Sequence, residues 1–133
     1  GLLATMRSIS ALRVTVPVSD LARAQKFYEE KLGLGPGTPI GPGLSFQCGF
    51  GTAFFMYPSA GAGTNQASCA FWKVNDVKAV VTWLKSRGVV FEEYDMPGLK
   101  TENGIAELGG VKGAWFKDTE GNIIALTEMP NPA

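Results

Sequence analysis

Histidine, the side chain that most often binds metals or moves protons near neutral pH, is absent from the 133 residues of this chain. Two thiols remain as candidate nucleophiles or soft ligands, Cys48 and Cys69, but their spacing matches neither a zinc finger nor a redox motif. Two cysteines are also too few for a disulfide framework. We therefore expect two free, partly buried thiols and no histidine-based metal centre.

Carboxylates cluster at Glu92, Glu93 and Asp95, where a pair could carry out acid–base chemistry. Neighbouring residues on a strand point to opposite faces, so Glu93 could act with Asp95 but not with Glu92. A solvated strand edge is the favoured explanation of such a cluster. The loop that follows, residues 96–104, has the length and the glycines of a lid over a cleft, but also those of a passive surface loop.

The elements that must position these groups occur twice along the chain. Residues 12–18 alternate in polarity as a strand does, and apolar residues then recur at helical spacing from Leu21 to Gly33. The same order returns with a strand over 68–74 and an apolar helical stripe that begins at Val77 and ends at Gly88. Further strands are predicted over 44–48, 52–57, 89–94, 112–117 and 122–128.

This repeat, with a period of roughly 56 residues, predicts an α+β fold. Two βαβββ modules in tandem would form curved mixed or antiparallel half-sheets around a cleft, with the helices outside. We expect one domain over 1–133, with module one at about 8–58, a linker at about 59–66 and module two at about 67–129.

The charge pattern excludes several classes of partner. Twelve basic and twelve acidic residues give a net charge of zero, and no lysine or arginine cluster recurs on a predicted helix face, which argues against nucleic acid and anionic membrane surfaces. No apolar run approaches the ~18 residues of a membrane-spanning helix. We expect a cytoplasmic protein whose partner is a small molecule, and a homodimer is left open.

Two motifs resemble a known family. Val-Ser-Asp-Leu-Ala-Arg-Ala-Gln-Lys-Phe-Tyr at residues 18–28 and Phe-Lys-Asp-Thr-Glu-Gly-Asn at residues 116–122 resemble signatures of the vicinal oxygen chelate superfamily. That superfamily includes glyoxalase I, extradiol dioxygenases, fosfomycin-resistance transferases and bleomycin-resistance binding proteins. The resemblance spans about residues 10–128 and implies the fold, whereas one such fold serves many functions.

The resemblance also implies where a metal would bind. Enzymes of this family hold a divalent ion with a histidine on the first strand of each repeat and a glutamate on a final strand. Those positions fall on Arg13, Cys69 and Ala125 here. A guanidinium has no lone pair to donate, and hard divalent ions prefer oxygen and nitrogen to a lone thiolate, so we expect no metal and no cofactor.

The same register predicts the lining of the cleft. If Arg13 and Cys69 face inward, Thr15 and Pro17 share the face of Arg13, and Phe71 and Lys73 share that of Cys69. In the resembling transferases an aromatic three residues before the Asp of the last turn faces the cleft, which implies Trp115, with Lys117 on its side. The hairpin adds Tyr57 or Met56. The predicted ligand-binding residues are Arg13, Thr15, Tyr57, Cys69, Phe71, Trp115 and Lys117, and no catalytic residue is assigned.

The leading functional hypothesis is a metal-independent binding protein that holds a small molecule in this cleft. An anionic or aromatic ligand is expected, anchored by Arg13 with Lys73 and Lys117 nearby. The alternative is a metal-free lyase or isomerase that uses Tyr57, Glu93 or Cys69 for proton transfer, with Arg13 favouring the thiolate. A purely structural role in dimerisation would be favoured if aromatic side chains filled the cleft.

Overall fold

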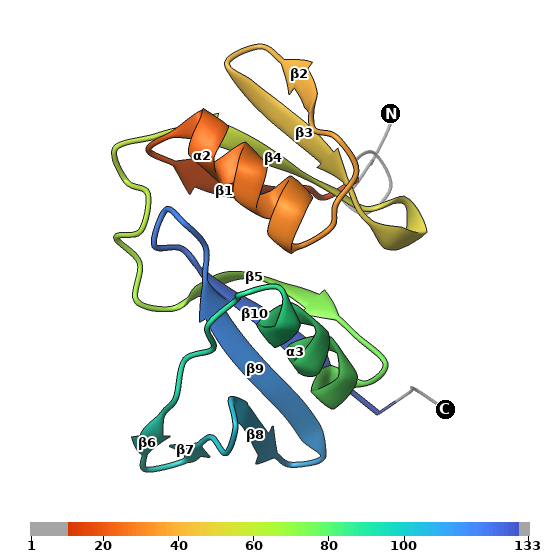
Figure 1. The fold of residues 1–133 in the computed structure, drawn as a ribbon, viewed down its shortest axis with the longest axis vertical. Coiled ribbons are helices and arrows are strands. Elements are labelled where there is room, and N and C mark those ends of the chain that lie inside the picture. The colour runs from red at the N-terminus through yellow and green to blue at the C-terminus, as the bar shows by residue number, and fades with distance from the viewer. Residues whose placement is uncertain (1–10, 131–133) are drawn as a thin grey trace, which may run out of the picture.

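The computed structural model describes residues 11–130, and it contains two four-stranded mixed sheets (Figure 1). The first has the strand order β1-β4-β3-β2, with β1 parallel to β4 and the other neighbours antiparallel. The elements of this first half are β1 (Val14–Val18), α2 (Leu21–Lys26), the π-helical turn η1 (Phe27–Lys31), β2 (Thr38–Ile40), β3 (Gly43–Gln47), the 3₁₀ turn η2 (Gly49–Gly51) and β4 (Ala53–Pro58).

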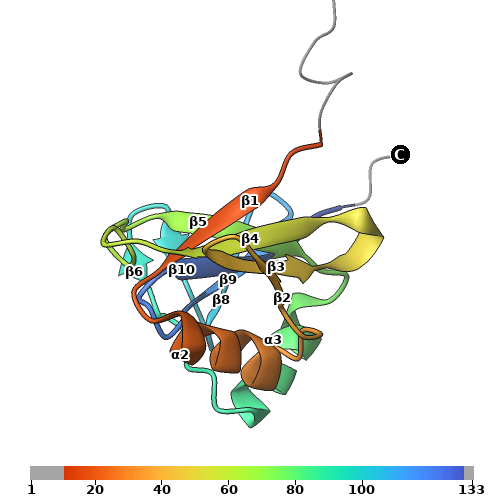
Figure 2. The same ribbon diagram turned by 90° about the horizontal axis from the view of Figure 1, so that it is seen from above.

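The second half repeats this arrangement with the strand order β5-β10-β9-β8, and β5 runs parallel to β10. Its elements are β5 (Ser68–Lys73), α3 (Val77–Ser86), β6 (Asp95–Met96), β7 (Leu99–Lys100), β8 (Ile105–Leu108), β9 (Val111–Lys117) and β10 (Ile123–Glu128). Both helices lie on the same side of the sheets (Figure 2). The predicted α+β fold class is confirmed. Among the helices of residues 11–130, none has the length and apolar character needed to span a membrane.

Local sequence explains where the helices begin. Asp20 accepts a hydrogen bond from the backbone N–H of Arg23 at 3.0 Å, and Asp76 accepts one from that of Ala79 at 3.1 Å. These N-caps satisfy backbone donors that a helix leaves unpaired in its first turn. In α3 the stripe Val77, Val81 and Leu84 is buried as its spacing predicts.

The first helix departs from its predicted regularity after Lys26, where it widens into η1. The N–H of Leu32 bonds to the carbonyl of Phe27 at 3.2 Å, five residues back. Phe27 packs against the cores of both halves. Tyr28 is fully buried in the first core, 5.5 Å from the ring of Phe54. The wider turn brings two consecutive rings inward, and such turns are frequent at functional sites.

The segment 89–94 is not the predicted strand. It makes one isolated bridge, Phe91 to Phe116, because β8 forms the ladder on that side of β9. The small β6–β7 hairpin, from Asp95 to Lys100, overlaps the predicted loop at 96–104, and β2 is a short strand where none was predicted.

Candidate ligand-binding cavity

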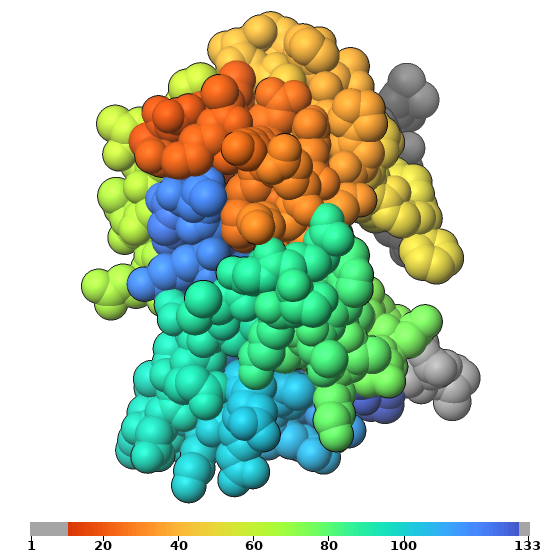
Figure 3. Space-filling view, in the orientation of Figure 1, coloured from red at the N-terminus to blue at the C-terminus, as the bar shows by residue number. Residues whose placement is uncertain are grey.

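A cavity of about 390 Å³ lies between the two halves of the molecule. The edge strands β1 and β5 contribute to it, together with η1, β4 and the η2 turn. Its lining residues are Val14, Val16, Tyr28, Cys48, Gly49, Phe50, Thr52, Ala53, Phe54, Ala70, Phe71, Trp72, Lys73 and Ile124. Figure 3 shows a hollow in the surface at this place, between the η2 turn and β5.

The inner wall of the cavity is aromatic and held rigidly. Phe54 meets Trp72 edge to face at 6.0 Å between ring centroids, and it stacks on Phe46 at 5.1 Å. Trp72 packs against both cores, so it joins the halves at the cavity. Cys48 lies beside these rings, and burial raises the pKa of its thiol. This wall therefore offers apolar area with little polarity.

The floor of the cavity is a neutral phenol. Tyr28 donates a hydrogen bond from its hydroxyl to Oδ2 of Asp118 at 2.7 Å. Burial, together with the nearby Asp118 carboxylate, holds the pKa of Tyr28 well above its ordinary value. The hydroxyl is thus protonated and already engaged, so it is poorly placed to transfer a proton to a ligand.

The rim of the cavity is the η2 turn. Phe50 lies between two glycines with φ +60° and ψ +35°, a left-handed conformation that is strained for a bulky residue. Its side chain is fully exposed although it borders the cavity. A large ring held out in solvent at the mouth of an aromatic pocket is available to close over a ligand.

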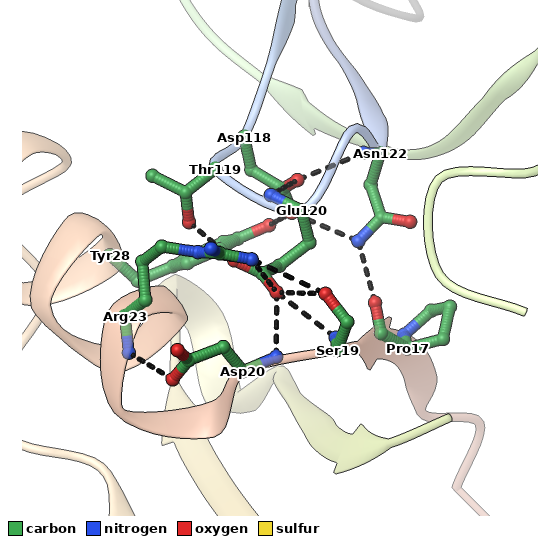
Figure 4. A network of polar contacts seen from close by, with 9 residues as sticks. All are labelled: Pro17, Ser19, Asp20, Arg23, Tyr28, Asp118, Thr119, Glu120 and Asn122. Atoms are coloured by element: carbon green, nitrogen blue, oxygen red, sulfur yellow. Dashed lines mark hydrogen bonds and ion pairs between the residues drawn. The ribbon is translucent and has the colours of Figure 1, made fainter. Parts of the chain in front are cut away.

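A polar network fixes the two halves around this cavity (Figure 4). We call the turn at residues 118–122 the latch. Glu120 of the latch accepts hydrogen bonds from the backbone N–H groups of Ser19 at 3.0 Å and Asp20 at 2.8 Å, next to the start of α2. Arg23 donates to the same carboxylate through Nε at 2.8 Å and Nη2 at 3.1 Å.

The electrostatics of Glu120 reflect these contacts. Burial acts to raise the pKa of this carboxyl, but the hydrogen bonds from Arg23, from the Asp20 backbone and from the Thr119 and Ser19 hydroxyls outweigh it and lower the pKa to about 2. In the same latch, Asn122 donates from Nδ2 to the carbonyl of Pro17 at 2.7 Å. Second-half residues thus hold both β1 and the start of α2.

Only some of the residues that sequence predicted for the site border this cavity. Phe71 lines the cavity, and Lys73 does so too. Thr15 and Tyr57 alternate with the buried Val16 and Met56, so they lie on the sheet face away from the helices. This resolves the choice between Tyr57 and Met56, because Met56 is core.

Trp115 lies on the corresponding face of the second sheet, between the buried Ala114 and Phe116. The centroids of its ring and of the Tyr94 ring lie 5.7 Å apart. Lys117, at the end of β9, lies 3.4 Å from the carboxylate of Glu92. Neither side chain borders the cavity described above.

Arg13 is exposed just before β1, and its Nη1 donates to the carbonyl of Leu12 at 3.0 Å. Cys69 instead packs against the second core, because the β5–β10 register shifts between Ile123 and Ile124 and leaves it without a partner. Such a bulge breaks the alternation from which its orientation was inferred. Burial and the Asp118 carboxylate raise the pKa of Cys69, so the expected stabilisation of its thiolate is wrong. Both cysteines are free and partly buried, as predicted.

The donor set for the family's metal does not fit these positions. Arg13 carries a cation, Ala125 is a buried methyl group between Phe71 and Trp115, and the thiol of Cys69 points into the core. Within residues 11–130 no three His, Cys, Asp or Glu side chains lie close enough to hold an ion.

Two functional features were missed from sequence alone. Trp72 was not among the predicted site residues, but it borders the cavity while it also packs against both cores. Glu120 was not singled out either, although it is 7% exposed. The position of Glu120 inside the second motif was the available signal, but its partners lie about a hundred residues away.

Comparisons with known proteins agree with the fold described above. The family model described as Glyoxalase/Bleomycin resistance protein/Dioxygenase superfamily matches residues 10–126. A glyoxalase/bleomycin resistance protein/dioxygenase from Alicyclobacillus acidocaldarius superposes with a TM-score of 0.69 at 16% identity, covering 92% of this chain and 93% of that one.

TnmS3, an antibiotic binding protein from Streptomyces sp. CB03234, gives a TM-score of 0.66 at 26% identity, covering 92% of this chain and 98% of that one. A comparison with curated proteins finds no match. Because the family model spans most of the sequence and the fold agrees with it, the chain belongs to the glyoxalase/bleomycin resistance protein/dioxygenase superfamily.

Proposed function

We propose that the protein is a metal-independent small-molecule binding protein, and that it holds an apolar, ring-containing ligand in the cavity between its halves. The observation that carries this proposal is the cavity itself, whose 390 Å³ lies within the range of small-molecule sites, roughly 300–1,000 Å³. Phe54, Phe71 and Trp72 supply aromatic area for affinity, and Thr52 and Lys73 supply the sparse polar groups that orient a ligand.

The likeness to TnmS3 supports the same class of function. That protein is described as an antibiotic binding protein, and the alignment covers 92% of this chain at 26% identity. Binding and sequestration require only a shaped cavity. A protein with this function therefore needs no metal ligands at the family's metal positions, which are Arg13, Cys69 and Ala125 here.

An enzymatic role gains no comparable support. Tyr57, Glu93 and Cys69, the residues considered for proton transfer, are all absent from the lining of the cavity. Tyr28, which does line it, is bonded to Asp118. The binding proposal is therefore the one that we develop.

Blocking the cavity should abolish binding without unfolding the protein. The probe is N-phenyl-1-naphthylamine, a neutral aromatic dye whose emission rises in apolar surroundings. In Val14→Trp an indole replaces a small side chain at the β1 side of the cavity, and we expect at least a tenfold increase in the dissociation constant. Dye titration followed by the emission of the directly excited dye measures it.

Val90→Trp is the matched control, because Val90 is 80% exposed and does not line this cavity. It should bind the dye as the unmodified protein does, and both variants should unfold cooperatively. Equal affinity of Val14→Trp and Val90→Trp would show that the dye binds elsewhere and would refute the proposed site.

The rim contributes through Phe50. In Phe50→Gly the ring is lost but the left-handed backbone is relieved of roughly 1 kcal/mol of strain, so the free energy of unfolding should change by less than about 1 kcal/mol. Dye affinity should fall threefold to tenfold, because a ring that covers a ligand buries apolar area. Met96→Gly, at another exposed apolar residue outside the cavity, serves as control and should leave affinity unchanged. Unchanged affinity in Phe50→Gly would mean that the rim does not close on the ligand.

A further inference from the structure

We propose that Lys73 gives the cavity a preference for ligands that carry an anionic group on their apolar body. The inference rests on the proposed function, because it concerns the ligand class of the same site. Among the described residues 11–130, Lys73 is the one charged residue in the cavity lining, and every other lining side chain there is apolar or neutral. The described lining therefore carries a positive charge, which comes from the ammonium group of Lys73.

The position of Lys73 suits this role. It is the last residue of β5, directly after Phe71 and Trp72, and it is exposed where it borders the cavity. A lysine in such a position can pack its aliphatic stem on an aromatic wall while its ammonium stays in water at the mouth. Within residues 11–130 it forms no ion pair, whereas Lys112 and Lys117 each have a glutamate partner. An anionic ligand would thus meet a cation that no described side chain neutralises.

One lining residue, Tyr28, is hydrogen-bonded to a carboxylate, that of Asp118. Asp118 is not a lining residue, is 6% exposed and already accepts hydrogen bonds from Tyr28, Asn122 and the N–H of Glu120. A cationic ligand would find no carboxylate among the described residues that line the cavity, and desolvation of its charge would go uncompensated. The cavity therefore discriminates against cations as well as favouring anions.

This assignment changes the anchor that sequence suggested. Arg13 was expected to hold an anionic group, but it does not line the cavity, and its guanidinium donates a hydrogen bond to the carbonyl of Leu12. Lys73, which sequence treated as an accessory at a strand end, borders the cavity itself. A lysine acts as a point charge on a flexible stem, so it accommodates sulfonate, carboxylate or phenolate groups without requiring a fixed fork geometry.

Two dyes with the same rings test the inference. N-phenyl-1-naphthylamine is neutral, and 1-anilinonaphthalene-8-sulfonate adds one negative charge to the same body. In Lys73→Gln we expect the dissociation constant of the sulfonate to rise about fivefold to tenfold, because a charge-assisted contact is lost, and that of the neutral dye to change less than twofold. The sulfonate affinity of the unmodified protein should also fall as salt screens the contact.

Lys26→Gln is the matched control, since it removes the same charge from an exposed position on α2 outside the cavity. If Lys73→Gln and Lys26→Gln affect the sulfonate equally, or neither does, the role of Lys73 is overturned while binding of the neutral dye still supports the cavity. If Val14→Trp fails to weaken either dye, the proposed function itself is wrong, and the inference falls with it.

Discussion

Replacing Glu120 by glutamine should lower the free energy of unfolding by roughly 2–3 kcal/mol. The carboxylate accepts charge-assisted hydrogen bonds from Arg23 and bonds from the N–H groups of Ser19 and Asp20, and a glutamine would face the guanidinium with its own donors. The side chain of Arg23 is 51% exposed, so the ion pair alone contributes modestly. Most of the loss comes from the amide N–H groups that would face the Arg23 guanidinium, and from the weaker acceptor that a neutral amide oxygen offers the backbone N–H groups of Ser19 and Asp20. Chemical denaturation measures the change.

The same carboxylate makes stability depend on acid. Its pKa lies near 2 in the folded protein, against an ordinary 4.5, so the unfolded chain takes up its proton first as the pH falls. The stabilisation is therefore complete above about pH 4.5 and is lost between there and pH 2. In Glu120→Gln that part of the pH dependence should disappear.

Glu107→Gln is a suitable control, because Glu107 is exposed on β8 and its side chain makes no hydrogen bond or ion pair within the described part of the chain. It should change stability by less than about 0.5 kcal/mol. If Glu120→Gln matches Glu107→Gln at pH 7, or keeps the full acid dependence between pH 4.5 and 2, the latch does not hold the halves as described.

Sequence predicted the parts of this fold that depend on local interactions. The two helices and the buried stripe of α3 follow from spacing within a few residues, and both are present, with Asp20 and Asp76 as the N-caps. The error at 89–94 has a different origin. Its residues resemble a strand, but strand formation depends on a free partner, and β8 occupies the edge of β9 instead.

The site was harder to predict because it depends on how the halves meet. Alternation correctly separates Tyr57 from Met56 and places Trp115 opposite Phe116. It cannot reveal that a cavity remains between β1 and β5, so Trp72 was not identified as a lining residue, although it packs against both cores. It also failed at Cys69, where a bulge that no sequence rule signalled breaks the alternation.

Gly63→Ala should destabilise the protein by about 3 kcal/mol, although Gly63 lies in a segment that sequence treated as a plain linker. Its φ is +71°, and an added Cβ would lie 2.4 Å from the carbonyl oxygen of Glu120 and 3.2 Å from Cα of Gly121. Its N–H also donates to Oδ1 of Asn122 at 3.2 Å, so the linker is docked on the latch. The new methyl group would have to displace backbone rather than a flexible side chain.

Gly41→Ala separates the two causes of this effect. Gly41 also has a positive φ, +53°, but no atom lies within 4 Å of its added Cβ, so this variant meets only the backbone strain, about 1 kcal/mol. The difference between the two variants, measured by denaturation, isolates the contact between linker and latch. Because Asp118 of the latch holds Tyr28 at the floor of the cavity, Gly63→Ala should also weaken dye binding, whereas Gly41→Ala should not. Equal destabilisation by the two variants, with unchanged dye affinity, would mean that the linker merely passes over the latch and plays no part in shaping the cavity.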